Sequence, residues 1–219
     1  MSTPALLSFT LSPRRGFHST LSAGIALYKA APGCSSFILY TLPPSIIVDR
    51  YELSDRNITF ELWGESNLEL PVFAVEQSDV TLLLSAMPAA PHLQEVVVDV
   101  PIHVRYGPPL SSYTHYQSIE IPPPMCFWAC PGFVDPSFRS TSSPPVERSE
   151  MLRRFAYFLV PETAPLLAAA KLEIPLGSLH DLPLVEAGTA TVVLVAFLWL
   201  LYRSWACAEK LRTQHLKQQ

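Results

Sequence analysis

The chain has 219 residues with a formal net charge of −4, and 49% of its residues are hydrophobic while 16% are charged. This balance excludes an intrinsically disordered chain, which combines low hydrophobicity with high net charge, and it gives no basic surface of the kind that binds nucleic acid. Prolines number 22 against 8 glycines. Because proline is rejected from helix interiors and central strands, we expect short strands separated by proline-marked turns.

The first residues lack the pattern of a secretory signal. Such a signal places basic residues before an apolar core of about 7 to 15 residues, whereas Arg14 and Arg15 follow a weakly apolar stretch at residues 5–11. We therefore expect an N-terminal segment, residues 1–15, without a clear signal peptide. The residues that follow, 16–183, are enough for one domain with a real core.

The most regular strand pattern lies at residues 96–106. Hydrophobic side chains occupy alternate positions there, with polar residues and Pro101 between them, which predicts a strand with one buried and one polar face. Since proline cannot donate to a ladder, this strand should lie at an edge or break at Pro101. Further candidate strands are residues 37–42, 58–62, 72–75, 80–84 and 116–121. Short strands in this number indicate a mainly β fold, an antiparallel β-sandwich-like domain.

Helical and irregular segments are expected toward the end of this domain. Residues 151–159 are the best helical candidate outside the C-terminal region, and residues 163–172 are the next. Residues 131–150 are rich in serine and proline, which predicts a loop or linker.

Cysteines are the residues most informative about compartment. On a straight strand Cys126 and Cys130 would be about 13 Å apart, too far for a bond without a bend. A disulfide would therefore involve Cys34 and leave one thiol free, which suits an oxidising compartment; the alternative is three buried, reduced thiols. Cys207, near the C-terminus, is either an inert thiol or a juxtamembrane palmitoylation site.

No recognisable catalytic or metal-binding motif is present. None of the six histidines has HExxH or HxH spacing, so we expect no metal site. The sequence also has no nucleophile elbow, phosphate loop or dinucleotide fingerprint. We therefore expect no catalytic residues and no bound cofactor.

Residues 184–202 predict a transmembrane helix. Their one charge is Glu186, near the start, and as a helix at about 1.5 Å per residue they would extend roughly 28 Å, close to the hydrocarbon thickness of a bilayer. Basic residues dominate residues 203–219 and acidic residues precede the span, which places the tail in the cytosol and the domain in the lumen. A glycosylation sequon at Asn57 agrees with a luminal position of the domain. The alternative is a tail-anchored protein with a cytosolic domain.

Several sequence blocks resemble one known family. They are GFHSTL (residues 16–21), CSSFILYTLPPSIIVDRYEL (34–53), VPIHVRYGPP (100–109), FWAC (127–130) and IPLGSLHDLP (174–183). In this order, before a single C-terminal span, they are similar to the PIG-X family, whose yeast counterpart is the protease B non-derepressible protein. The resemblance covers about residues 16–202.

The resemblance implies a single-pass glycoprotein of the endoplasmic reticulum membrane with a luminal domain. Proteins of this family are accessory subunits of glycosylphosphatidylinositol (GPI) mannosyltransferase I. They stabilise the multi-spanning catalytic subunit that adds the first mannose to the GPI-anchor precursor. The alternatives are a stand-alone chaperone-like or binding protein of the same compartment, and an enzyme in its own right.

Four residues are candidates for contact with such a partner. His103 and Arg105 belong to the polar side of the predicted strand, where they would face a partner or be fixed structurally; the alternative is a solvated face. Gly188 and Thr191 lie among small residues of the span, which would let another helix approach closely. The alternative for this pair is simple contact with lipid.

Overall fold

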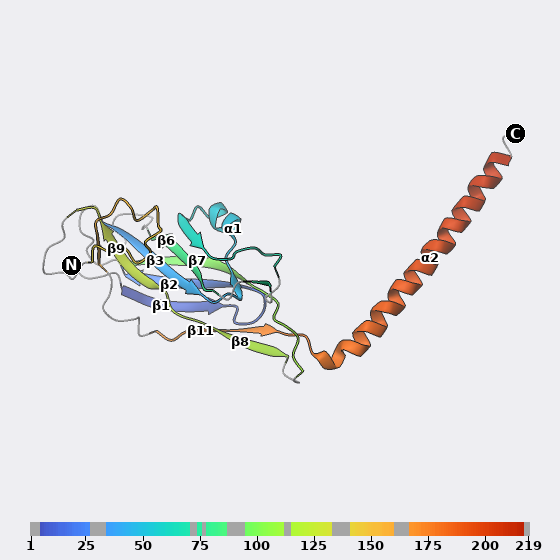
Figure 1. Cartoon of the computed structure of the whole chain (residues 1–219), viewed down its shortest axis with the longest axis horizontal. Coiled ribbons are helices and arrows are strands. Elements are labelled where there is room, and N and C mark those ends of the chain that lie inside the picture. The colour runs from blue at the N-terminus through green and yellow to red at the C-terminus, as the bar shows by residue number, and fades with distance from the viewer. Residues whose placement is uncertain are drawn as a thin grey trace. The chain divides into compact units, whose positions relative to one another are not determined.

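The computed structural model describes residues 5–26, 34–70, 74–75, 78–86, 95–111, 115–132, 141–159 and 167–216. The chain divides into two units. One comprises Met1–Pro108 and Tyr116–Leu176, and the other comprises Pro109–His115 and Gly177–Gln219. The first unit is a β-rich domain, and the second contains a long helix (Figure 1).

The first sheet has four strands in the order β1-β2-β7-β4. They are β1 (Ala5–Ser12), β2 (His18–Ala26), β7 (Glu95–Val104) and β4 (Ile46–Ile47), and all pairs are antiparallel. β4 pairs with β7 only at His103 and Val104. At Pro101 the side of β7 away from β2 therefore has no strand partner among the described residues, and proline is tolerated at such a position.

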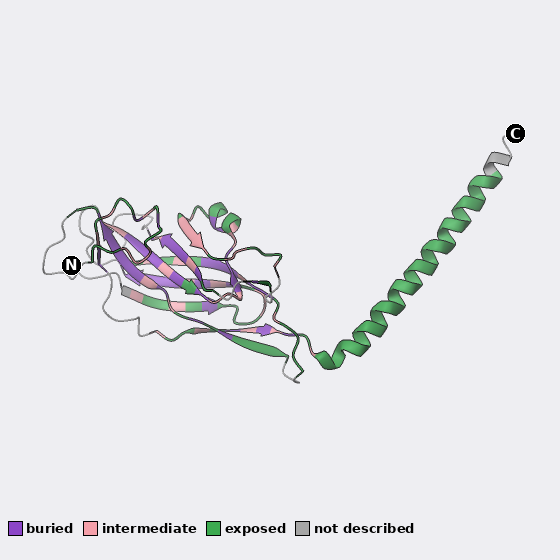
Figure 2. Ribbon diagram, viewed as in Figure 1, coloured by how far each residue is buried: buried purple, intermediate pink, exposed green. Residues whose placement is uncertain are grey.

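The second sheet has five antiparallel strands in the order β10-β9-β3-β6-β5. They are β10 (Tyr157–Leu159), β9 (Met125–Cys130), β3 (Ser35–Leu42), β6 (Val80–Ser85) and β5 (Phe60–Trp63). Buried side chains from both sheets form one core, with Leu21 and Ile102 from the first sheet and Ile38 and Leu82 from the second (Figure 2). The domain is an antiparallel β-sandwich-like fold, as the sequence predicts.

A third, two-stranded antiparallel sheet pairs β8 (Tyr116–Ile121) with β11 (Ala170–Pro175). Strand β11 of this sheet contacts the segment that connects β1 to β2. The Gly16 N–H donates to the carbonyl of Glu173 at 3.0 Å, and the Arg15 side chain forms an ion pair with the Glu173 carboxylate at 2.5 Å.

Five strand predictions are confirmed, each within two residues at either end, the usual uncertainty of element boundaries. The predicted strands at residues 37–42, 58–62, 80–84, 96–106 and 116–121 correspond to β3, β5, β6, β7 and β8.

The helix predicted at residues 151–159 is wrong. Residues 151–154 form turns and the segment ends in strand β10. Leu152 and Phe158 are buried in a second apolar cluster that also contains Phe37 and Phe127 of the five-stranded sheet. Burial of these side chains against the sheet therefore overrides the helical pattern.

Other predictions for the loops have mixed outcomes. For the helix predicted at residues 163–172, residues 163–166 lie outside the described residues, and strand β11 begins at Ala170, so a helix does not extend to its predicted end. In the strand predicted at residues 72–75, residues 72–73 lie outside the described residues, and the described residues 74–75 are not part of a strand. The described part of residues 131–150 contains no helix or strand.

The second unit contains the short helix η2 (Leu179–Asp181) and the helix α2 (Leu182–Leu216), which has 35 residues. By length and composition α2 is a candidate membrane span, and it includes the predicted residues 184–202. Its side chains are exposed from residue 182 to residue 213 (Figure 2). Such a long exposed apolar helix suits a lipid environment.

Candidate interaction site

Segments that are distant in the sequence meet at the C-terminal end of β7. In the register of β2 and β7, His18 lies opposite His103, and Ile47 of β4 lies opposite His103 on the other side. The helix α1 (Arg50–Asp55) and residues 65–70 also reach this end of β7, through hydrogen bonds to His103 and Arg105. We call this region the β7-end site.

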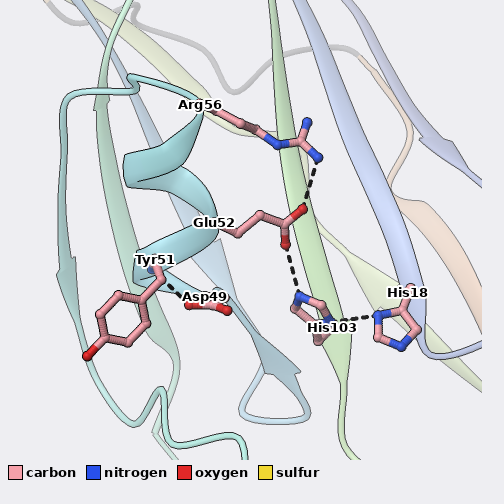
Figure 3. Close-up of polar contacts among 6 residues, drawn as sticks. All are labelled: His18, Asp49, Tyr51, Glu52, Arg56 and His103. Carbon is pink, nitrogen blue, oxygen red and sulfur yellow. Dashed lines mark hydrogen bonds and ion pairs between the residues drawn. The ribbon is translucent and has the colours of Figure 1, made fainter.

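The N-terminus of α1 is fixed by a side-chain cap. The Asp49 carboxylate accepts the backbone N–H of Tyr51 at 2.8 Å (Figure 3), which satisfies a donor left free at the start of a helix. Leu53 on the same helix is fully buried in the main core. A helix of six residues is marginal alone, so this cap and this anchor hold it in place.

The C-terminus of α1 is closed by two backbone bonds. The N–H groups of Asn57 and Ile58 donate to the carbonyls of Ser54 and Leu53 at 2.9 and 3.1 Å. Asn57 has a φ of 57°, in the left-handed region that this type of helix end requires. Asparagine tolerates that region better than most residues. Asn57 therefore has a structural role in addition to being an exposed sequon residue.

A row of polar side chains links α1, β7 and β2 (Figure 3). Arg56 donates to one oxygen of Glu52 at 2.9 Å, and the other oxygen lies 3.1 Å from Nε2 of His103. Nδ1 of His103 lies 2.7 Å from Nδ1 of His18, so one ring must carry the proton that the two nitrogens share. The row is partly exposed, with 22% of the His103 side chain accessible. It ties three elements together at the surface.

Arg105 is buried, with 3% of its surface exposed. Its Nη1 donates to the carbonyls of Asn67 and Leu70 at 2.6 and 2.7 Å, and its Nη2 donates to that of Glu65 at 3.5 Å. Burial lowers the pKa of Arg105, while Glu65 acts in the opposite direction. A guanidinium directed at the carbonyls of residues 65–70 has a structural role. Only 3% of the residue is exposed, so the contacts that the structure shows for its side chain are within the domain.

A pocket of about 450 Å³ lies at the β7-end site. Its lining includes Phe17 and Tyr106, whose ring centroids are 4.1 Å apart, together with Leu68 and Leu70. Tyr106 is 73% exposed and Leu68 is 49% exposed. His18, His103 and Glu69 add polar groups to the lining. The pocket has the size and the mixture of aromatic, aliphatic and polar groups that are typical of binding sites.

The cysteines of the domain are divided between a disulfide and a thiol. Cys34 is bonded to Cys130, which links the start of β3 to the end of β9. Cys126 is a buried free thiol, and burial raises its pKa to about 12, so it is no thiolate nucleophile at neutral pH. Cys207 is free and exposed. Within the described part of the chain, no group of three or more His, Cys, Asp or Glu residues could hold a metal ion.

The two candidate residues of the span belong to the second unit. A side chain added at Gly188 would meet open space. The Thr191 hydroxyl donates to the Ala187 carbonyl at 2.7 Å, so its hydrogen-bonding capacity is used within the helix. What both positions offer a neighbouring helix is therefore small size rather than a free polar group.

Sequence reasoning misses several members of the site. Glu52 and Arg56 have a signal, since an acid four residues before a base on a helix predicts a side-chain pair. The approach of His18 to His103 has no local signal, because it depends on which strands pair. Nor does the sequence indicate that residues 65–70 are bonded to Arg105.

The fold defines a class of protein, a β-sandwich-like domain accompanied by one candidate membrane span. A family model described as PIG-X / PBN1 matches residues 14–205, and the chain belongs to this family. Similar proteins include Protein pbn1 of Emericella nidulans (28% identity, 96% of this chain and 46% of the relative) and Protein PBN1 of Gibberella zeae (29%, 86% and 41%). Protein pbn1 of Schizosaccharomyces pombe is 24% identical over 87% of this chain and 57% of its own. The chain thus spans about half the length of these relatives. No solved structure matches.

Proposed function

We propose that this protein is a non-catalytic accessory subunit of GPI mannosyltransferase I and stabilises the catalytic subunit that adds the first mannose to the GPI-anchor precursor. The observation that carries the proposal is membership of the PIG-X / PBN1 family over residues 14–205. One candidate span next to a folded domain supports it. Such a chain can contact a multi-spanning partner both in lipid and in water, and each contact raises the effective concentration of the other.

The proposed topology is a luminal domain, a span at residues 184–202 and a cytosolic tail at residues 203–219, in the endoplasmic reticulum membrane. The sequence places the domain at residues 16–183, and β1 (Ala5–Ser12), which pairs with β2, extends it toward the N-terminus. The excess of basic residues in the tail supports this orientation. The bond between Cys34 and Cys130 supports it as well, because disulfides persist in oxidising compartments such as the lumen. We propose that Asn57, which is exposed, carries a glycan.

Contact with the partner is proposed at two places. In the domain it is the β7-end site, with His103 at the surface and Arg105 acting through residues 65–70. In the span it is the small-residue stretch around Gly188 and Thr191. These small side chains would allow close helix packing, which is a main attraction between helices in lipid.

Affinity purification of the tagged full chain from detergent-solubilised membranes tests the function. The catalytic subunit should co-purify, and its steady-state amount should fall when the chain is depleted. Recovery of the chain without the transferase, with transferase levels unchanged on depletion, would instead support a stand-alone chaperone-like protein. Mannosyl transfer by the purified chain alone would make it an enzyme.

A further inference from the structure

We propose that the pocket between Phe17, Tyr106 and Leu68 receives a large apolar side chain of the catalytic subunit, and that a neighbouring basic residue of that subunit pairs with Glu69. We call it the docking pocket. This contact rests on the proposed function, because the occupant belongs to the catalytic subunit. It adds the chemistry of the contact and the residues that make it.

Large apolar side chains are exposed together at the docking pocket. Single exposed apolar residues are ordinary on protein surfaces. Here Tyr106 and Leu68, both substantially exposed, line the same pocket of about 450 Å³ together with Phe17. Interfaces concentrate their binding energy where an aromatic or aliphatic anchor of one partner fills such a pocket of the other.

The lining of the docking pocket is held in place before any partner arrives. Arg105 bonds to three carbonyls of residues 65–70, which include the lining residue Leu68. The next residue, Tyr106, lies against the ring of Phe17. Burying a guanidinium is expensive unless its donors are satisfied, and here these donors are used to fix a surface segment. A preformed pocket avoids the ordering entropy of binding.

The charge at the docking pocket favours a cation on the partner. Glu69 is exposed at the pocket, and among the described residues no cation pairs with its carboxylate. The guanidinium of Arg105 is directed at backbone carbonyls, and His103 lies in the row with Glu52 and His18. The Glu69 carboxylate can therefore accept a hydrogen bond from a cation. The one arginine or lysine among the described lining residues is Arg105, whose donors already bind carbonyls, so the lining has no free basic group for an anion. This complementarity favours an apolar anchor next to a lysine or arginine rather than a phosphate group.

Site-specific photo-crosslinking in membranes tests the proposal. A benzophenone amino acid replaces Tyr106 in one full-length variant and Tyr116 in the matched control, since Tyr116 is also an exposed tyrosine, on β8, outside the pocket. The variant at position 106 should form an adduct with the catalytic subunit, and the control should not. Mass spectrometry should place the linked residue within a few positions of a lysine or arginine.

A charge reversal tests the second half of the proposal. Glu69→Lys should reduce the catalytic subunit retained by the chain about tenfold, whereas Glu69→Gln should have a smaller effect, because only the reversal adds repulsion. Protease resistance of the domain and an intact disulfide show that each variant is folded. If Glu69→Lys is not folded, the crosslink at position 106 still tests whether the catalytic subunit occupies the docking pocket.

The outcomes separate the two proposals. If the unmodified chain does not retain the catalytic subunit, the proposed function and the occupant of the pocket both fall. If it does, but position 106 crosslinks no better than position 116, or only to lipid or another protein, the docking pocket is refuted and the proposed function stands.

Discussion

Replacing Arg105 by alanine should destabilise the domain and loosen residues 65–70. The side chain donates to carbonyls of Asn67 and Leu70 at 2.6 and 2.7 Å. Hydrogen bonds to charged groups contribute about 1.5–3 kcal/mol each, and water will replace part of this near the surface. We therefore expect a loss of about 3 kcal/mol. For a domain of this size, that corresponds to a fall in the thermal midpoint of roughly 6–12 °C.

The assay is thermal unfolding of the purified full chain in detergent, followed by intrinsic fluorescence. Arg50→Ala is the matched control, because Arg50 is an exposed arginine on α1, and it should change stability by less than about 0.5 kcal/mol. Arg105→Lys should recover only part of the loss, because an ammonium lacks the planar fork of donors. If Arg105→Ala unfolds at the wild-type temperature but loses the partner, Arg105 contacts the partner directly, and its assignment as a structural residue is refuted.

Three further predictions concern the core, the sequon and the span. Ile102→Asp buries a charge at a position that is 1% exposed and should abolish the protease-resistant domain, whereas Val97→Asp, at 63% exposure on the same strand, should be tolerated; equal behaviour would contradict the assigned faces. Thr59→Ala should remove an endoglycosidase-sensitive mobility shift without changing the thermal midpoint, and a shift that persists would count against the sequon. Replacing Gly188 and Thr191 together by leucine should preserve insertion and lower the amount of catalytic subunit several-fold; unchanged levels would make the helix only an anchor.

The sequence predicts strands well where their two faces differ strongly. Residues 96–106 alternate between hydrophobic and polar side chains, and β7 forms there. No strand is predicted at β2, although most of its residues are buried or half-buried. Its sequence, HSTLSAGIA, mixes small side chains on both faces, so the contrast between the faces is weak. When the two faces differ little in hydrophobicity, the sequence shows no alternating pattern, although the strand can still pair with its neighbours.

The sequence predicts the candidate site only in part, because its geometry depends on contacts between distant segments. His103 is recognisable from its place in the strand pattern. Its neighbours His18 and Glu52 are 85 and 51 residues away along the chain, and they reach it through the strand order β2-β7-β4 and the position of α1. The same pattern assigns Arg105 to the polar side of the strand. Alternation does not reveal that residues 65–70 bond to that side chain and that it is buried.

The stabilising side chains of the β7-end site have one physical consequence for function. The six-residue helix α1 is marginal alone, and the segment at residues 65–70 is bonded to Arg105 through its carbonyls. The first is fixed by its caps and the row through Glu52, and the second by Arg105. A surface that is held in part by these bonds can be lost by substitutions that touch no partner. For this reason Arg105→Ala should lower retention of the catalytic subunit as Glu69→Lys does, but only Arg105→Ala should also lower the thermal midpoint substantially.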